Sequence, residues 1–212
     1  MADRDVADHS VPFSLSTVPF PSATLHEAAG QIGALPSAIK PAFAGARMAG
    51  PAYPVNCAAG DNLWIHRALL AAAPGDVLVV SVDGAAEFGY WGEVLSTAAI
   101  ARGLGGLVID GGVRDQLALA GLAFPVFCAG VCIRGTGKDP GSAGSLGAPV
   151  RIGEVTVSRG DLVAGDADGV VVIPLADAAA VLTAAAEREA KEVELMRRLR
   201  GGETTIDLLG LS

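Results

Sequence analysis

Three short apolar runs that alternate with helical segments constrain the fold more than any other feature of the chain. Residues 77–82 (VLVVSV), 107–110 (LVID) and 126–129 (VFCA) are typical of buried strands. Residues 93–103 and 114–121 lie between them and carry apolar side chains at helical spacing. Strands that alternate with helices form parallel sheets, because each helix returns the chain to the same edge. The centre of the chain therefore predicts an α/β fold.

The N-terminal part is expected to hold an arm followed by a helix. Residues 1–21 contain several prolines and predict an extended N-terminal arm. Ser22 is a candidate N-cap for a helix over residues 24–32. No repeat or change of composition divides residues 22–212, so we expect them to form a single domain.

Two prolines affect the prediction for the strand that follows. Residues 47–55 have the composition of a strand, but Pro51 and Pro54 favour an edge or bulged position, because proline has no N–H for a sheet ladder. Asp61 or Asn62 is then expected to cap the next helix.

The second half of the chain is predicted to be β-rich and to end in one long helix. Residues 150–157, 162–164 and 170–173 are apolar runs bounded by turn residues. Residues 177–200 form a continuous helical pattern with an apolar side and a polar side. A helix of this length needs a cover for its apolar side, so we expect a homo-oligomer.

Composition argues against several classes of protein. The net charge of −8 and the pI of about 4.8 are unlike the basic footprint of a nucleic-acid-binding protein. No apolar run has transmembrane length and the N-terminus has no signal-peptide pattern, so we expect a cytoplasmic protein without membrane contact. Three cysteines, an odd number, are typical of free thiols in a reducing compartment. None of the histidines lies at the sequence spacing from these cysteines that is typical of zinc sites, which argues against bound zinc.

The most informative motif joins two short segments across one helix and one strand. Residues 92–95 (Gly-Glu-Val-Leu) open one predicted helix, and Arg114-Asp115 follows a predicted strand. Twenty residues separate Glu93 from Arg114, enough for one helix and one strand. Active groups of α/β proteins gather at the carboxyl ends of parallel strands. We therefore expect the two segments to meet at one sheet end.

Both segments carry chemistry suited to a carboxylate and a cation. The first amides of a helix have no internal partner and bind anions. Arg114 offers a planar fork for a carboxylate, and Asp115 offers a hard oxygen ligand for a cation. Each segment alone also has an ordinary interpretation, as a plain loop-to-helix start at 92–95 and as a surface arginine beside an aspartate that caps a helix.

These motifs occur together with others along most of the chain. The matching pieces are Thr24-Leu25-His26-Glu27-Ala28, Gly60-Asp61-Asn62, Pro74-Gly75-Asp76-Val77, Gly92-Glu93, Gly111–Asp115, Pro125-Val126, Gly160-Asp161 and Asp168-Gly169-Val170. With them, the chain resembles the class II pyruvate aldolases that cleave 4-hydroxy-4-methyl-2-oxoglutarate and 4-carboxy-4-hydroxy-2-oxoadipate. These enzymes belong to the superfamily of the regulator of ribonuclease activity A (RraA-like).

The resemblance implies a fold and an activity. The fold is a compact α/β/β/α sandwich of the RraA-like type, assembled as a trimer or a dimer of trimers. The activity is a carbon–carbon lyase reaction that depends on Mg²⁺ or Mn²⁺ and releases pyruvate from a 4-hydroxy-2-oxo acid, with oxaloacetate decarboxylation as a further activity. The alternative is a non-catalytic protein-binding regulator. The regulator branch generally lacks the aspartate after the arginine, so Asp115 favours an enzyme.

The resemblance also implies a role for each motif residue. The carboxylate of the substrate is held by Arg114 together with the backbone of Gly92, Glu93, Val94 and Leu95.

The metal and the acid–base chemistry are implied to involve three further side chains. Asp115 is the protein ligand of the metal ion, and Glu93 orients or deprotonates a water molecule. A glutamate from the C-terminal helix of a neighbouring subunit approaches the site, with Glu194 the first match by position and Glu192 the second.

Four other polar residues have open interpretations. His66 is expected to be a packed or hydrogen-bonded histidine, with a place near the site as the alternative. Asp110 is expected to cap the turn at residues 111–112, with a place near the metal as the alternative. Arg134 and Lys138 lie in a glycine-rich loop and are either solvated or available to a distal carboxylate of the substrate.

Overall fold

The structure is a computed structural model that describes residues 13–14 and 16–211. Most of the arm predicted for residues 1–21 therefore lies outside the described residues. The helices are α1 (Ser22–Ala28), α2 (Leu63–Ala71), α3 (Glu93–Ala101), α4 (Gln116–Leu122), α5 (Ala178–Arg200) and α6 (Thr205–Leu209). The strands are β1 (Lys40–Pro41), β2 (Met48–Cys57), β3 (Val77–Ser81), β4 (Gly89–Trp91), β5 (Gly106–Val113), β6 (Val126–Val131), β7 (Gly144–Leu146), β8 (Val150–Ile152), β9 (Val155–Val157), β10 (Leu162–Gly165) and β11 (Val170–Ile173).

One sheet carries most of the strands, and it runs in the order β1-β6-β5-β3-β2-β10-β11. The pairs β2–β3, β3–β5 and β5–β6 are parallel, whereas β2–β10 and β10–β11 are antiparallel. The predicted strands at the centre of the chain are confirmed, and so are the helices between them. Each crossover helix packs on the parallel part, as the α/β pattern requires.

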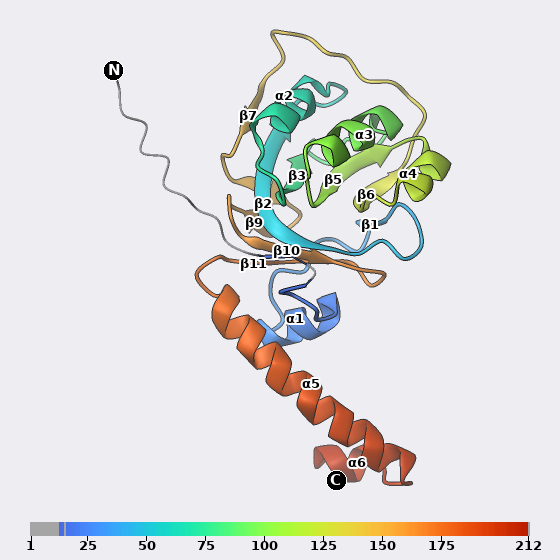
Figure 1. Cartoon of the computed structure of the whole chain (residues 1–212), viewed down its shortest axis with the longest axis vertical. Helices are drawn as coiled ribbons and strands as arrows, with labels where there is room; N and C mark the ends of the chain where they lie inside the picture. Colours follow the sequence, from blue (N-terminus) through green and yellow to red (C-terminus); the bar gives the residue numbers. More distant parts are fainter. Residues whose placement is uncertain (1–12, 15, 212) are drawn as a thin grey trace.

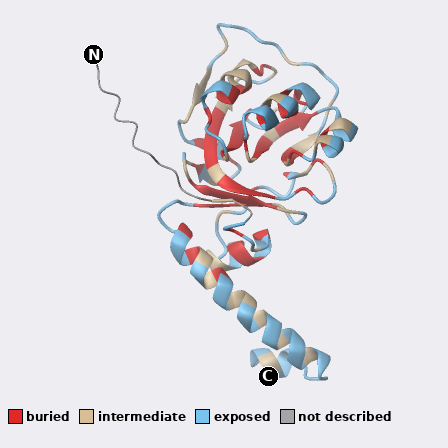
Figure 2. Ribbon diagram, in the orientation of Figure 1, coloured by how far each residue is buried: buried red, intermediate tan, exposed pale blue. Residues whose placement is uncertain are grey.

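Three hydrophobic clusters separate four layers (Figures 1 and 2). In the first cluster, helices α2, α3 and α4 cover one face of the parallel strands. In the second, the other face of these strands packs against β8–β11. The long strand β2 joins the two parts of the sheet, because its first half pairs with β10 and its second half with β3. In the third, α1 and the start of α5 cover the outer face of β10 and β11. The predicted α/β/β/α sandwich is thus confirmed.

Strand β2 lies inside the sheet, so its predicted place at an edge is wrong. Pro54 falls in the gap between the pairing of β2 with β10, which ends at Pro51, and its pairing with β7, which begins at Val55. On that side of β2, the Ala52 amide donates to the carbonyl oxygen of Asp161 (2.7 Å). Pro51 precedes the parallel ladder with β3, which begins at Ala52. Neither proline therefore removes a ladder hydrogen bond.

Strand β5 continues to Val113, so the turn predicted at residues 111–112 is wrong. Asp110 does not cap that turn. Its carboxylate accepts hydrogen bonds from the end of β3, from Val82 N (2.6 Å), Gly84 N (3.1 Å) and Ser81 Oγ (3.2 Å). Burial raises the pKa of Asp110, although these hydrogen bonds oppose the shift. Asp110 therefore ties β5 to the segment at the end of β3.

The two glycines in β5 are explained by the close approach of the segment that leads into β4. A Cβ on Gly111 would lie 2.8 Å from the ring of Tyr90, and one on Gly112 would lie 2.5 Å from the carbonyl oxygen of Ala86 and 2.6 Å from that of Phe88. Neither position has room for a side chain. The glycine pair therefore lets β4 pair with the end of β5, which carries the segment before α3 to the same place as the segment before α4.

Helix α1 begins two residues earlier and ends sooner than the sequence indicates. Ser22 is its first residue rather than its cap, and both Ser22 N (2.7 Å) and Ser22 Oγ (2.6 Å) donate to the carboxylate of Asp166. The helix ends at Ala28, and Gly30 follows with a φ of +76°, which glycine adopts readily.

The predicted strand over residues 150–157 is a hairpin of β8 and β9, and Gly153 adopts a φ of +60° at the turn. Helix α5 confirms the predicted C-terminal helix and projects away from the sandwich (Figure 1). Its buried residues belong to the first turns, whereas Val193 and Met196 are exposed farther along. Among the described residues, no helix is long and apolar enough to cross a membrane.

Candidate functional site

A pocket of about 190 Å³ lies where β4 leads into α3 and β5 leads into α4. The residues lining it come from α2 and the position before it, from these two turns and from the loop that follows β6: Asn62, His66, Gly89, Tyr90, Trp91, Gly92, Val94, Leu95, Arg114, Asp115, Gly135, Thr136 and Lys138. The two segments singled out in the sequence therefore do meet at one sheet end.

Asp115 packs closely against Gly92 in the wall of the pocket. Asp115 has a left-handed backbone (φ 60°, ψ 36°), a conformation that Asp tolerates better than most residues. Its Oδ2 accepts the backbone N–H of Glu93 (3.1 Å), and a Cβ at position 92 would lie only 2.3 Å from the same oxygen. The approach of Asp115 to the start of α3 thus requires glycine at position 92.

The N-terminus of α3 keeps two amides available for an anion. The first hydrogen bond of α3 runs from Ser96 N to Gly92 O (3.0 Å). The amide of Glu93 donates to the Asp115 carboxylate instead. Among the described residues, the amides of Val94 and Leu95 have no acceptor. Of the four backbone positions predicted to hold a carboxylate, these two offer unpaired donors, and the helix dipole favours an anion there.

Arg114 adds a guanidinium beside these amides. Its Nε lies 3.7 Å from Asp115 Oδ2, and the two side chains are 47% and 40% exposed. An ion pair this open to water contributes little to stability. The guanidinium is therefore available to pair with an incoming carboxylate.

Asp115 also fits the chemistry of a hard-cation ligand. One of its oxygens accepts the Glu93 amide, whereas within the described chain Oδ1 has no hydrogen-bond partner. Mg²⁺ and Mn²⁺ take oxygen ligands, and Mg²⁺ commonly binds through one or two carboxylates while it keeps several waters. The Glu93 side chain is exposed and does not line the pocket, although its amide orients Asp115.

Helix α2 brings two residues to the pocket that the motif analysis did not assign to the site. Asn62 and His66 are four positions apart and both line it. Burial lowers the pKa of His66, and the charge of Lys138 lowers it further, so the imidazole is neutral near pH 7. The alternative reading of His66 as a group near the site matches this placement.

Arg134 and Lys138, which the sequence placed in one loop, have different surroundings in the structure. Lys138 lines the pocket, whereas the guanidinium carbon of Arg134 lies 5.3 Å from the centroid of the Phe88 ring.

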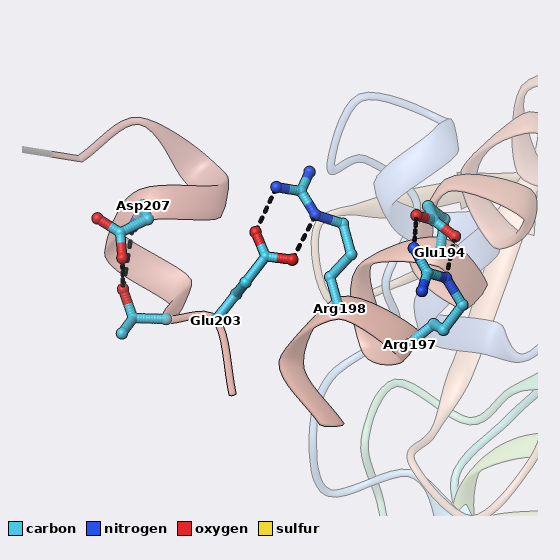
Figure 3. A network of polar contacts seen from close by, with 6 residues as sticks. Glu194, Arg197, Arg198, Glu203 and Asp207 are labelled. Atoms are coloured by element: carbon cyan, nitrogen blue, oxygen red, sulfur yellow. Dashed lines mark hydrogen bonds and ion pairs between the residues drawn. The ribbon is translucent and has the colours of Figure 1, made fainter. Parts of the chain in front are cut away.

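Glu194 is remote from the pocket of its own chain. It lies on the exposed part of α5, which adjoins α1, β10 and β11, whereas the pocket lies on the side of α2, α3 and α4 (Figure 1). Figure 3 shows Glu194 paired with Arg197 through two hydrogen bonds (2.7 and 2.6 Å), and this pairing lowers the pKa of Glu194. Arg198 pairs with Glu203 in the same way, close to α6. Only a second copy of the chain could bring Glu194 to Asp115.

Replacement of Gly92 by alanine tests the contact between the two turns. The added Cβ must displace the Asp115 carboxylate, so we expect ligand binding or turnover at this pocket to fall by about a hundredfold, as for a misplaced reacting group. Gly121→Ala is the matched control, because nothing lies within 4 Å of a Cβ there and alanine favours a helix. Equal activity of the two variants would contradict the assigned contact.

The protein is an α/β/β/α sandwich with a pocket lined by a guanidinium, a carboxylate and the start of a helix, and known proteins share this fold. The family profile described as RraA-like, Aldolase/RraA matches residues 5–172. A protein of Halalkalibacterium halodurans named "Putative 4-hydroxy-4-methyl-2-oxoglutarate aldolase" is 36% identical over 172 residues, which cover 81% of each chain. The chain belongs to the RraA-like family.

Solved structures share the fold. A crystal structure of an uncharacterised protein from Pseudomonas syringae pv. tomato has a TM-score of 0.80 and 28% identity, over 89% of this chain and 90% of that one. The RNA-processing inhibitor RraA from Thermus thermophilis has a TM-score of 0.66 and 25% identity, over 73% of this chain and 92% of that one. The proteins similar to this chain thus include one named a putative aldolase and one named an RNA-processing inhibitor.

Proposed function

We propose that this chain is a divalent-metal-dependent aldolase that cleaves a 4-hydroxy-2-oxo acid, such as 4-hydroxy-4-methyl-2-oxoglutarate, to pyruvate and a second oxo compound. The observation that carries the proposal is the turn at Arg114-Asp115 beside the start of α3. It sets a carboxylate beside a guanidinium and the start of α3, and within the described part of the chain one carboxylate oxygen and two helix amides there have no partner. A 2-oxo acid presents the matching groups, namely a carboxylate and an adjacent keto oxygen.

The residues of this chain then have separate tasks. Arg114 and the amides of Val94 and Leu95 bind the carboxylate of the oxo acid and fix its orientation. Asp115 holds the metal ion, and the Glu93 amide keeps the Asp115 carboxylate in place. Bound Mg²⁺ or Mn²⁺ would supply Lewis-acid stabilisation of the negative charge that develops on the oxo acid.

Cleavage also needs a base for the 4-hydroxyl group. We assign Glu93 the task of orienting or deprotonating a water molecule of the site. Its side chain is exposed and follows Gly92, which lines the pocket. Oxaloacetate decarboxylation leaves the same three-carbon product, pyruvate. The groups that bind the carboxylate and the cation therefore suit it as a second activity.

A neighbouring subunit is proposed to complete the site through Glu194. The exposed Val193 and Met196 on the projecting part of α5 are suited to contact with another copy in a trimer or hexamer. Asp115→Ala and Glu194→Ala proteins, each inactive alone, are expected to regain part of the activity when they are dissociated, mixed and reassembled, because some sites then receive both native groups. Verified mixed oligomers without recovered activity would remove Glu194 from the site.

Pyruvate release tests the proposal directly. The purified protein is incubated with 4-hydroxy-4-methyl-2-oxoglutarate or oxaloacetate, with Mg²⁺, with Mn²⁺ or with a chelator, and pyruvate is measured by coupling to lactate dehydrogenase. We expect pyruvate release above that of matched protein-free mixtures only when a metal ion is present. Folded protein that releases none from a panel of 4-hydroxy-2-oxo acids would instead favour the regulator alternative, which the likeness to the RNA-processing inhibitor supports.

A further inference from the structure

Lys138 is held at the pocket by the backbone on both sides of it. The loop that follows β6 returns to the segment before α2 (Figure 1). On one side of Lys138, the amide of Gly137 donates to the carbonyl oxygen of Gly60 (2.7 Å). On the other side, the amide of Asp139 donates to Asp61 Oδ2 (2.7 Å). These hydrogen bonds fix the place from which the Lys138 side chain leaves the loop.

The ammonium group of Lys138 is exposed and unpaired. Lys138 lines the pocket, and among the residues that the structure describes its side chain forms no ion pair and no hydrogen bond. Burial lowers the pKa of His66, and the positive charge of Lys138 lowers it further. The ammonium group therefore lies within electrostatic range of an imidazole that lines the same pocket.

Arg134 belongs to the same loop but is placed differently. Its guanidinium carbon lies 5.3 Å from the centroid of the Phe88 ring, a favourable contact for a cation, and Arg134 does not line the pocket. Within the described chain, the cationic side chains in the pocket lining are thus Arg114 and Lys138, which come from different segments.

Two cationic side chains in one pocket suit a ligand with two anionic groups. In the proposed aldolase function, Arg114 binds the carboxylate of the oxo acid and Asp115 holds the metal ion. Lys138 then has no counter-charge, because no carboxylate of the described chain pairs with it. A substrate with a second carboxylate supplies one, and an ammonium group forms a charge-assisted hydrogen bond with it.

We infer that Lys138 is a specificity-determining residue that binds a second carboxylate, carried by the hydroxyl-bearing carbon of the substrate. This inference rests on the proposed aldolase function and narrows its substrates to 4-hydroxy-2-oxo dicarboxylates. Cleavage next to the hydroxyl-bearing carbon leaves this carboxylate on the fragment that separates from pyruvate. The second product is then itself a 2-oxo acid rather than an uncharged carbonyl compound.

Two substrates that differ in this carboxylate test the inference. 4-Hydroxy-2-oxopentanoate has a hydrogen atom where 4-hydroxy-4-methyl-2-oxoglutarate has its second carboxylate, and cleavage of either releases pyruvate. We expect Lys138→Met to lower kcat/KM for the dicarboxylate about tenfold more than kcat/KM for the monocarboxylate, as for loss of a hydrogen bond between charged groups. Lys138→Arg keeps the charge, so the ratio of the two activities is expected to stay within about threefold of the wild type.

Arg134→Met is the matched control, because it removes the same charge from the same loop but outside the pocket lining. Its ratio of the two activities is expected to be unchanged. An equal effect of Lys138→Met on both substrates would overturn the inference, and so would the same change of ratio in Arg134→Met. Wild-type protein that cleaves only the monocarboxylate would overturn the inference alone, whereas protein that cleaves neither would contradict the proposed function itself.

Affinity provides a second measurement that needs no turnover, and it decides the case in which the wild type cleaves only the dicarboxylate. 2-Oxoglutarate and 2-oxopentanoate share the oxo-acid end, and only 2-oxoglutarate has a second carboxylate. In calorimetric titrations with Mg²⁺, we expect Lys138→Met to bind 2-oxoglutarate about tenfold more weakly than the wild type and to bind 2-oxopentanoate equally well. Equal affinities of wild type and variant for 2-oxoglutarate would overturn the inference, as would wild-type protein that does not prefer 2-oxoglutarate.

Discussion

Replacement of Asp115 by asparagine is expected to abolish metal-dependent pyruvate release, a loss of more than about a thousandfold, while the protein stays folded. Asparagine keeps an oxygen that accepts the Glu93 amide, and it tolerates the left-handed backbone found at this position. It removes only the negative charge that a hard cation requires.

Asp115→Ala separates this chemical effect from stability. Alanine at a φ of 60° is strained by about 1–2 kcal/mol and leaves the Glu93 amide without its acceptor, so the alanine variant is expected to lose thermal stability as well as activity. Activity, metal affinity and melting temperature are measured on both variants. Full activity of Asp115→Asn at limiting Mg²⁺ would show that Asp115 does not hold the metal.

Arg114→Lys is expected to lower kcat/KM for the oxo acid by at least about tenfold, which corresponds to about 1.4 kcal/mol of transition-state stabilisation. Lysine keeps the charge but has a single ammonium group in place of the planar fork that matches a carboxylate. The folded state has little to lose, because Arg114 is half-exposed and its contact with Asp115 is long.

Arg102→Lys is the control for the general effect of this substitution. Arg102 donates to the carbonyl oxygen of Leu70 on the surface and does not line the pocket. Its activity is expected to match the wild type. If Arg114→Lys also retains more than about a tenth of the wild-type kcat/KM, the bidentate role of Arg114 is wrong.

Local patterns were sufficient for the elements whose partners are close in sequence. The apolar runs of β3, β5 and β6 alternate with helices, and this alternation predicts the parallel sheet. Elements that depend on distant partners were predicted poorly. β1 is two residues long and exists through its pairing with β6, and the position of β2 depends on strands more than ninety residues away.

The residues of the site also fall into those that local sequence patterns predict and those that only distant contacts place. Gly92, Arg114 and Asp115, and the Glu93 amide that binds Asp115, could be found from the sequence, because carboxyl ends of neighbouring parallel strands must meet at one edge. The presence of Asn62 and His66 could not, since α2 is held at the pocket by contacts with segments about thirty residues away, among them the bonds of Asn62 and Gly60 to Tyr90.

By itself, the sequence determined the α/β alternation, the long terminal helix and the acidic–arginine–aspartate motif, because each depends on local periodicity or on spacing along one crossover. The tertiary structure alone decided where the strand with two prolines lies, which helix amides remain unpaired and which side chains face the pocket. These features depend on contacts between segments far apart in the chain. The fit of Gly92 against Asp115 belongs to this second group, because only the packed turns show that a single Cβ would fill the space between them.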